Sequence, residues 1–281
     1  MAEPQVPPPA RSESREIAEL RRLKQEQPEL ASAADLQVEL LQLQRRVQSR
    51  VSLPVIRLEK DYLNGLLACP PMLQFEHIPI EWGDLRFLLR ATAAAMRSHD
   101  ALDDGDFRRI ENLCRDAERL PIALRSWYES PRRSAPPIAD DAAGLEPVIL
   151  QAMRPFLTRS ADAIMAKTDL AGWTAGWCPL CAGEPDFAVI TPAADRILIC
   201  ARCSARWHFH QITCPFCSNP DRNRMTSFAS RDGQYRLYAC DVCERYLKAF
   251  DARRASRPVM PAVDTVATLP LDAAAMQKGY K

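Results

Sequence analysis

Four pairs of cysteines, each in a C-x-x-C spacing, dominate the last third of this 281-residue chain. A C-x-x-C turn directs two thiolates toward one point, and two such turns together complete a tetrahedron around a cation such as zinc or iron. The sequence therefore predicts two four-cysteine metal sites. The eight candidate ligands are Cys178, Cys181, Cys200, Cys203, Cys214, Cys217, Cys240 and Cys243.

The intervals between the pairs indicate which cysteines share a metal. Eighteen residues separate Cys181 from Cys200 and 22 separate Cys217 from Cys240, so each interval can hold a short hairpin that returns the chain to the preceding pair. Only ten residues lie between Cys203 and Cys214. The simplest assignment is sequential, with the first two pairs at one metal and the last two at the other. A cross-braced arrangement remains open, because spacing alone does not exclude it.

Other uses of paired cysteines fit this chain less well. The N-terminus lacks the apolar segment of a secretory signal, and no run of 18 apolar residues suits membrane insertion, so we expect a cytoplasmic protein. Disulfides are rare in that reducing compartment, and a thioredoxin-type dithiol would need a βαβ context. An iron-sulfur cluster remains an alternative, since it also uses four thiolates.

The sequence favours a protein that is not an enzyme. Four protein ligands leave no open position on a metal for water or substrate, which is typical of structural sites. No Walker loop, G-x-G-x-x-G, G-x-S-x-G or H-E-x-x-H motif occurs. The two remaining cysteines, Cys69 and Cys114, lie in apolar or helical segments, where buried unreactive thiols are expected. An enzyme that acts through labile thiolates stays a third hypothesis.

The predicted fold class is α+β, with an all-α domain at residues 14–170. Apolar residues recur at helical spacing in 32–48, 84–96, 106–120, 121–127 and 145–167, and Asp84 is a candidate N-cap. Residues 1–13 are rich in Pro, Ser and charge, so we expect them to be disordered. Residues 131–141 have the composition of a linker inside the helical part.

After residue 170 the composition changes to Cys, Pro, aromatic and β-branched residues. Short runs at 187–190 and 196–199 are typical of small hairpins. We therefore expect two rubredoxin-like or zinc-ribbon modules, at residues 175–210 and 211–257. The last segment, 258–281, is predicted to be a loop followed by one short helix.

A cluster of aromatic and histidine residues stands between the second and third cysteine pairs. It consists of Trp207, His208, Phe209 and His210. Eight cysteines already fill two tetrahedra, so these histidines are expected to pack or to contact a partner rather than to bind metal. On a strand, His208 and His210 would share a face. We expect the four residues to form an exposed partner-binding surface.

The local charge gives limited support to nucleic-acid binding, which is the alternative function. Residues 196–257 contain twelve Lys and Arg side chains against five Asp and Glu. A divalent metal with four thiolates carries a net charge of about −2, so two such sites offset about four of those positive charges. Nucleic acid is therefore a less favoured partner, although zinc ribbons do bind it.

Three segments of the sequence resemble the FdhE family of formate dehydrogenase accessory proteins. They are WCPLC at 177–181, CARCSARWHFHQITCPFC at 200–217 and CDVCERYLKAF at 240–250. The ending VDTVATLPLDAAAMQKGY at 263–280 also resembles that family's C-terminus. The resemblance is specific over about residues 175–280 and only general over the helical part.

This resemblance implies a cytoplasmic maturation factor for respiratory formate dehydrogenase. Such a factor contacts the catalytic subunit before export and binds iron at rubredoxin-like sites, so all eight paired cysteines carry over as ligands. It favours iron over zinc, although zinc remains possible, and a homo-oligomer stays open. Family knuckles often place Gly directly after the second cysteine, whereas this chain has Ala182, Ser204, Ser218 and Glu244 there. The loop geometry and metal preference therefore depend on how these residues are accommodated.

Overall fold

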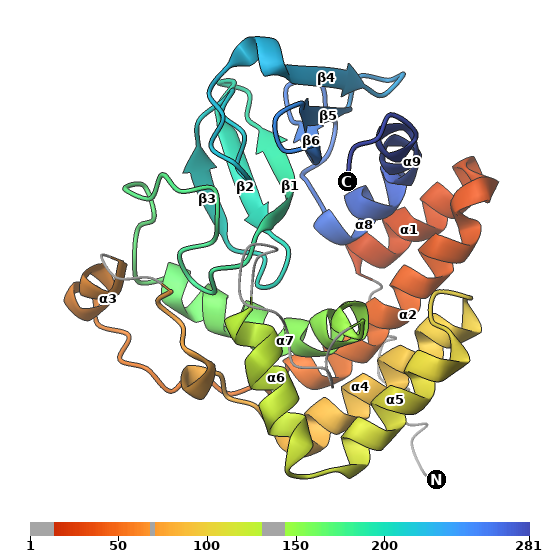
Figure 1. The fold of residues 1–281 in the computed structure, drawn as a ribbon, viewed down its shortest axis with the longest axis vertical. Coiled ribbons are helices and arrows are strands. Elements are labelled where there is room, and N and C mark those ends of the chain that lie inside the picture. Colours follow the sequence, from red (N-terminus) through yellow and green to blue (C-terminus); the bar gives the residue numbers. More distant parts are fainter. Residues whose placement is uncertain (1–13, 68–70, 131–143) are drawn as a thin grey trace, which may run out of the picture.

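The computed structural model describes residues 14–67, 71–130 and 144–281, and Figure 1 shows their arrangement. Residues 1–13, Cys69 and the linker at 131–141, for which the sequence makes predictions, lie outside the described residues. The helical part begins with α1 (Arg15–Glu26), which Ser14 caps by accepting a hydrogen bond from the Ile17 amide. The 3₁₀ turn η1 (Pro28–Leu30) leads into α2 (Ala31–Gln48).

Five further α-helices in the described residues complete the helical part. They are α3 (Lys60–Leu67), α4 (Trp82–Ser98), α5 (Asp104–Arg115), α6 (Arg119–Glu129) and α7 (Glu146–Met165), with a 3₁₀ turn η2 (Phe75–His77) before α4. Helix α7 buries residues such as Val148, Ile149 and Phe156 on several sides, so it lies at the centre of the helical core. Helices α2, α4, α5, α6 and α7 overlap the segments in which apolar periodicity predicts helices, whereas α1 and α3 are not among the predicted helices.

One predicted helix start is wrong by three residues. Helix α4 begins at Trp82 with Glu81 as its N-cap residue, so Asp84 lies inside the first turn. Its carboxylate instead accepts from the Arg50 guanidinium at 2.6 Å. A carboxylate in the first turn of a helix is favoured by the helix dipole, and this explains why it resembles a cap in the sequence.

The metal-ligand region forms a single sheet in the described residues. Its strands are β1 (Pro185–Ile190), β2 (Arg196–Cys200), β3 (Arg206–Phe209), β4 (Met225–Ala229), β5 (Tyr235–Cys240) and β6 (Arg245–Asp251), and their order is β3-β2-β1-β6-β5-β4. Strands β1 and β6 pair in parallel, with Val189 opposite Phe250, and the other neighbours are antiparallel. The two predicted modules are thus two antiparallel units joined edge to edge.

The sheet lies beside the C-terminal helices (Figure 1), and its strands contribute residues to one core shared with these helices and to another shared with the helical part. Phe187, Ile199 and Phe250 form a buried cluster with residues of α8 (Pro261–Ala267) and α9 (Leu269–Gln277). Alternate residues such as Leu198 and Leu247 belong instead to the large core of the helices. This alternation agrees with the period-two pattern of strands. Together with the helical part, it confirms the predicted α+β class.

The C-terminal segment holds two helices instead of the predicted loop and one helix. Its polar side chains connect it to the sheet. Asp264 accepts from Tyr235 Oη at 2.8 Å, and Asp272 accepts from Lys248 Nζ at 2.6 Å. The expected loop is helical because Val263 and Val266 pack against α1 and α2 and are buried there. This contact joins distant parts of the chain, so the local sequence does not indicate it. None of the described helices is both long and apolar enough to cross a bilayer.

Candidate metal centres

The four C-x-x-C turns share one backbone geometry. In each turn, the residue after the second cysteine donates its amide to the carbonyl of the first cysteine, at 2.9–3.1 Å. These residues are Ala182, Ser204, Ser218 and Glu244, and each has a φ between 56° and 60°. Side chains other than glycine tolerate this left-handed region poorly. The turns therefore form with a backbone strain that glycine at the same positions would relieve.

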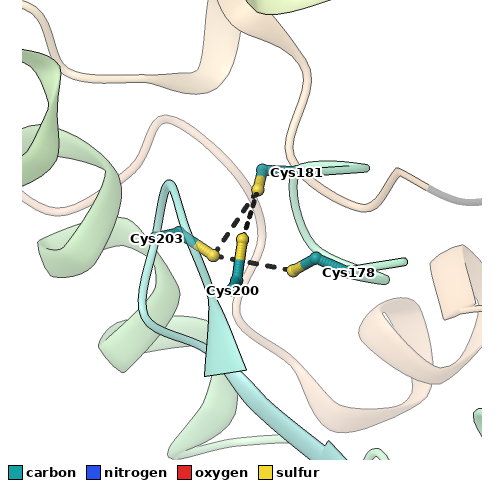
Figure 2. Close-up of side chains that lie close together, drawn as sticks. All are labelled: Cys178, Cys181, Cys200 and Cys203. Carbon is teal, nitrogen blue, oxygen red and sulfur yellow. Dashed lines mark hydrogen bonds between the residues drawn. The ribbon is translucent and has the colours of Figure 1, made fainter. Parts of the chain in front are cut away.

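The first two turns bring together a group that we call site 1. It consists of Cys178, Cys181, Cys200 and Cys203, whose side chains point toward one centre (Figure 2). The Sγ–Sγ distances are 3.6 Å from Cys178 to Cys203, 3.4 Å from Cys181 to Cys200 and 3.5 Å from Cys181 to Cys203. All four side chains are buried.

The last two turns form site 2, from Cys214, Cys217, Cys240 and Cys243. The Sγ–Sγ distance is 3.7 Å from Cys214 to Cys243 and 3.7 Å from Cys217 to Cys240. The Asn219 side-chain amide lies 3.8 Å from Cys240 Sγ as a donor. In contrast to site 1, Cys217 is exposed and Cys243 is partly exposed.

Both groups fit a tetrahedral ion. With metal–sulfur bonds of about 2.3 Å, the ligand atoms of a tetrathiolate site lie about 3.8 Å apart. The separations of 3.4–3.7 Å approach that value. All of them are much longer than the S–S bond of a disulfide, about 2.05 Å. The grouping is the sequential one, so the structure confirms that prediction and contradicts the cross-braced alternative.

Protonation of the thiols links metal binding to pH. Burial raises the pKa of Cys178 well above its ordinary value, and it raises the pKa of Cys243 to about 11. Burial also acts to raise the pKa of Cys240, yet hydrogen bonds from the backbone amides of Cys243 and Val242 and from the Cys217 and Cys214 thiols together lower this pKa to about 7. A thiophilic cation must displace the protons that these groups hold.

A buried arginine joins site 1 to the helical part. Arg202 lies inside the second C-x-x-C turn, where its backbone amide donates to Cys200 Sγ at 3.4 Å. Its guanidinium donates to the carbonyls of Trp127 at 2.8 Å and Tyr128 at 2.9 Å, at the C-terminal end of α6. A cation at this end of a helix satisfies free carbonyls and matches the helix dipole. Site 1 is therefore located at the joint between helices and sheet.

A second buried arginine lies next to site 2. Arg196 is 1% exposed, and its Nη1 donates at 3.0 Å to the carbonyl of Thr213, the residue before Cys214. Burial lowers the pKa of Arg196 to about 10. Its guanidinium lies over the rings of Phe209 and Tyr238. This contact fixes the chain as it enters the third turn.

The two sites are in direct contact through their backbones and one ion pair. A Cβ atom at Gly176, just before site 1, would lie only 1.9 Å from the Pro215 carbonyl oxygen in site 2. Arg245, after the fourth turn, forms two hydrogen bonds with Glu184, at 2.9 and 2.6 Å. The same guanidinium covers the ring of Phe216 at 3.7 Å. The sites therefore belong to one packed unit.

The predicted partner-binding surface is only half exposed. Strand β3 places His208 outward, and His210 follows it, also exposed. Trp207 and Phe209 are buried, so the expectation that they are exposed is wrong. The Trp207 indole donates to the Ala175 carbonyl at 3.0 Å. Alternation along the strand accounts for this, because outward histidines require the neighbouring aromatics to point inward.

Sequence reasoning missed the two arginines. Arg202 and Arg196 count toward the local positive charge, but both are buried. Others in the same region are paired, since Arg236 and Arg253 contact Asp251 and Arg257 contacts Asp264. Burial and pairing with carboxylates thus remove part of the free positive charge of this region, which further weakens the nucleic-acid alternative, although Arg222, Arg224 and Arg231 remain exposed. The position of Arg202 between two ligands was the one available sequence signal.

Cys114 takes no part in either site. It is buried in α5, and burial raises the pKa of its thiol to about 11. A buried thiol with a raised pKa is a poor nucleophile. This agrees with the expected unreactive cysteine.

Fold and site together define an α+β protein in which a helical part supports one sheet with two tetracysteine groups. No family model matches the chain. Protein FdhE of Escherichia coli K12 is 28% identical over 139 residues, a match that covers 48% of this chain and 44% of that protein. The Protein FdhE homolog of Cronobacter sakazakii is 26% identical over 175 residues, covering 61% of this chain and 55% of the homolog. These matches thus span about half the length of the relatives.

The solved structures include one with a similar fold. The crystal structure of the FdhE protein from Pseudomonas aeruginosa has a TM-score of 0.65 with 20% identity, over 95% of this chain and 92% of that one. The chain resembles the FdhE family in sequence over part of its length and in fold over nearly all of it. The predicted resemblance is confirmed.

Proposed function

We propose that this protein is a cytoplasmic, non-catalytic maturation factor for respiratory formate dehydrogenase. On this proposal, it contacts the catalytic subunit before export and holds two metal ions, with iron favoured. The observation that carries the proposal is the pair of tetracysteine groups on one sheet, in a chain that resembles FdhE proteins in sequence and fold. The accessory role itself is what the family resemblance implies.

The arrangement of the ligands supports a non-catalytic role. Each group supplies four thiolates, so a bound tetrahedral ion would have no open position for a substrate. The bound metal would supply a cross-link between turns and, if it is iron, a one-electron redox couple. The residues of the chain position the ligands. Four strained turns orient the thiolates, and Arg202 and Arg196 hold the surrounding backbone by hydrogen bonds to its carbonyls.

Metal content is the first test of this function. The full chain, purified anaerobically without added metal, is analysed for its elements and its visible absorption. We expect about two equivalents of transition metal, and ferric tetrathiolate would be coloured whereas zinc would not. A folded protein with less than one equivalent would contradict the metal-binding part of the proposal.

The proposed partner-binding surface consists of His208 and His210, because these two residues of the cluster are exposed. Both line a pocket of about 310 Å³ together with Trp173 and Thr174. His210 also lines a neighbouring pocket of about 450 Å³ that extends to Phe216. Histidines beside a partly apolar pocket suit a protein contact, because they combine ring surface with hydrogen bonding.

Co-purification tests this surface. The double variant His208→Ala/His210→Ala is expected to lose most of the formate dehydrogenase catalytic subunit that co-purifies with the unmodified protein. Its matched control is Ser227→Ala/Arg231→Ala at the opposite edge of the sheet, where both side chains are exposed. Equal retention by all three proteins would exclude this surface. Variants of Trp207 are unsuitable, since a loss of its buried packing would imitate a loss of binding.

A further inference from the structure

The two metal sites differ sharply in their access to solvent. At site 1 the exposed fractions of the four cysteines are 0%, 1%, 2% and 0% in chain order. At site 2, Cys217 is exposed, Cys243 is partly exposed, and Val242 between the two ligands of the fourth turn is 52% exposed. One site is enclosed and the other opens on the surface.

Site 1 is enclosed by the helical part. The amides of Met72 and Leu73 donate to the carbonyls of Pro179 and Leu180 within the first turn, at 3.0 and 2.9 Å. Arg154 of α7 donates to the Ala201 carbonyl inside the second turn at 3.0 Å. An incoming ligand could reach this sulfur cluster only if these hydrogen bonds separated first.

At site 2, the fourth turn is fixed by the end of the chain. Tyr280 Oη donates to Asp241 Oδ1 at 2.7 Å, and the Lys281 amide donates to the Glu244 carbonyl at 2.7 Å. These two contacts flank Val242 and Cys243. The ligands Cys240 and Cys243 therefore sit in a turn that is held on both sides.

The third turn is closed by its own backbone hydrogen bonds. Its beginning contacts a buried side chain, whereas its end is exposed to solvent. Arg196 fixes the Thr213 carbonyl beside the buried Cys214, whereas Cys217 is followed by the exposed Ser218. The side-chain amide of the neighbouring Asn219 is directed at Cys240 Sγ. Of the four ligands of site 2, Cys217 is the one that can move into solvent with the least change elsewhere.

We propose that site 2 exchanges its metal ion through Cys217, while site 1 is a closed structural site. An incoming soft thiolate would bond to an ion held in site 2 as the bond to Cys217 Sγ breaks, and further thiolates would then displace the other three cysteines in the same way, so that the ion leaves with its new ligands. No electrons are transferred. This inference rests on the metal-binding part of the proposed function and adds which site is exchangeable and which ligand leaves.

Release of zinc to a coloured chelator tests the difference. The full chain is loaded with two zinc equivalents under reducing, anaerobic conditions and mixed with excess chelator, with and without glutathione as the thiolate. We expect one equivalent to leave at least about tenfold faster than the other, with only the fast rate increasing with glutathione. Two equivalents that leave at one common rate would overturn the inference, while failure to load zinc would overturn the proposed function itself.

Two variants and one labelling experiment assign the fast equivalent. Cys217→Ser is expected to retain only the slow equivalent, and Cys203→Ser only the fast one; the reverse assignment would overturn the inference. Because Cys203→Ser could unfold, the unmodified zinc-loaded protein is also treated with iodoacetamide and mapped by mass spectrometry. Cys217 is expected to be alkylated first, and equal or earlier labelling of the site 1 cysteines would refute the proposal.

Discussion

Gly176 and Pro215 lie in contact across the two metal sites, with no room for a side chain at residue 176. We expect Gly176→Ala to push the first and third turns apart and to lower the free energy of unfolding by about 1–3 kcal/mol, as overpacking does. Urea unfolding of the metal-loaded protein measures this. Gly172→Ala is the control, because an added Cβ there meets nothing within 4 Å. Equal stability of the two variants would contradict the close packing of the sites.

The strained turns predict a stabilising substitution. Ser218 has a φ of 59°, so Ser218→Gly should raise the free energy of unfolding by up to about 1 kcal/mol. Ser227→Gly is the matched control in strand β4, where glycine should instead destabilise by about 0.5–1 kcal/mol. Thermal unfolding of both variants measures the two shifts. Shifts of the same sign would show that strain at residue 218 is unimportant.

Removal of the Arg202 guanidinium is predicted to lower the free energy of unfolding, because this side chain connects the helical part to the sheet. Arg202→Met leaves the carbonyls of Trp127 and Tyr128 without their donor in a buried place, so we expect a cost of about 2–4 kcal/mol. Arg206→Met, on the exposed side of β3, should change stability by less than about 0.5 kcal/mol. Chemical unfolding measures the stability of both variants. An Arg202→Met variant as stable as the unmodified protein would mean that water replaces the guanidinium as the donor to these carbonyls.

The ion pair between Lys248 and Asp272 is predicted to stabilise the docking of α9. Lys248 is 7% exposed, so Asp272→Ala would leave a buried charge without its partner and cost about 3 kcal/mol. The exposed pair of Lys24 and Asp35 has a similar 2.6 Å separation, yet Asp35→Ala should cost at most about 1 kcal/mol. The denaturant midpoints of the two variants, each relative to the unmodified protein, measure these two costs. Similar costs would show that burial does not govern these pairs.

Metal affinity should fall as the pH falls. Buried thiols such as Cys178, whose pKa is raised, hold their protons at neutral pH, so each bound ion must displace protons. Lower pH strengthens this competition, and higher pH relieves it. Competition with a chelator of known zinc affinity at pH 6 and pH 8 measures the effect. An apparent affinity that is independent of pH would mean that the thiols are already ionised in the metal-free protein.

Much of the candidate site follows from local sequence. The C-x-x-C spacing places two sulfurs on one turn, because the backbone reverses over those four residues, and the intervening hairpins return the chain to the preceding pair. Helices such as α2 and α7 follow from apolar spacing in the same way. Alternation along β3 also predicts that His208 and His210 share a face.

The tertiary structure alone decided what encloses each site. The parallel pairing of β1 with β6 joins residues about 60 positions apart, and the contact of Arg202 with Trp127 spans 75 positions. Such pairings depend on how whole elements pack, so no short pattern in the chain encodes them. The cysteine spacing by itself thus determined the two groups of four thiolates. Packing determined that one is buried beneath the helices, that the other opens at Cys217, and that Trp207 points inward.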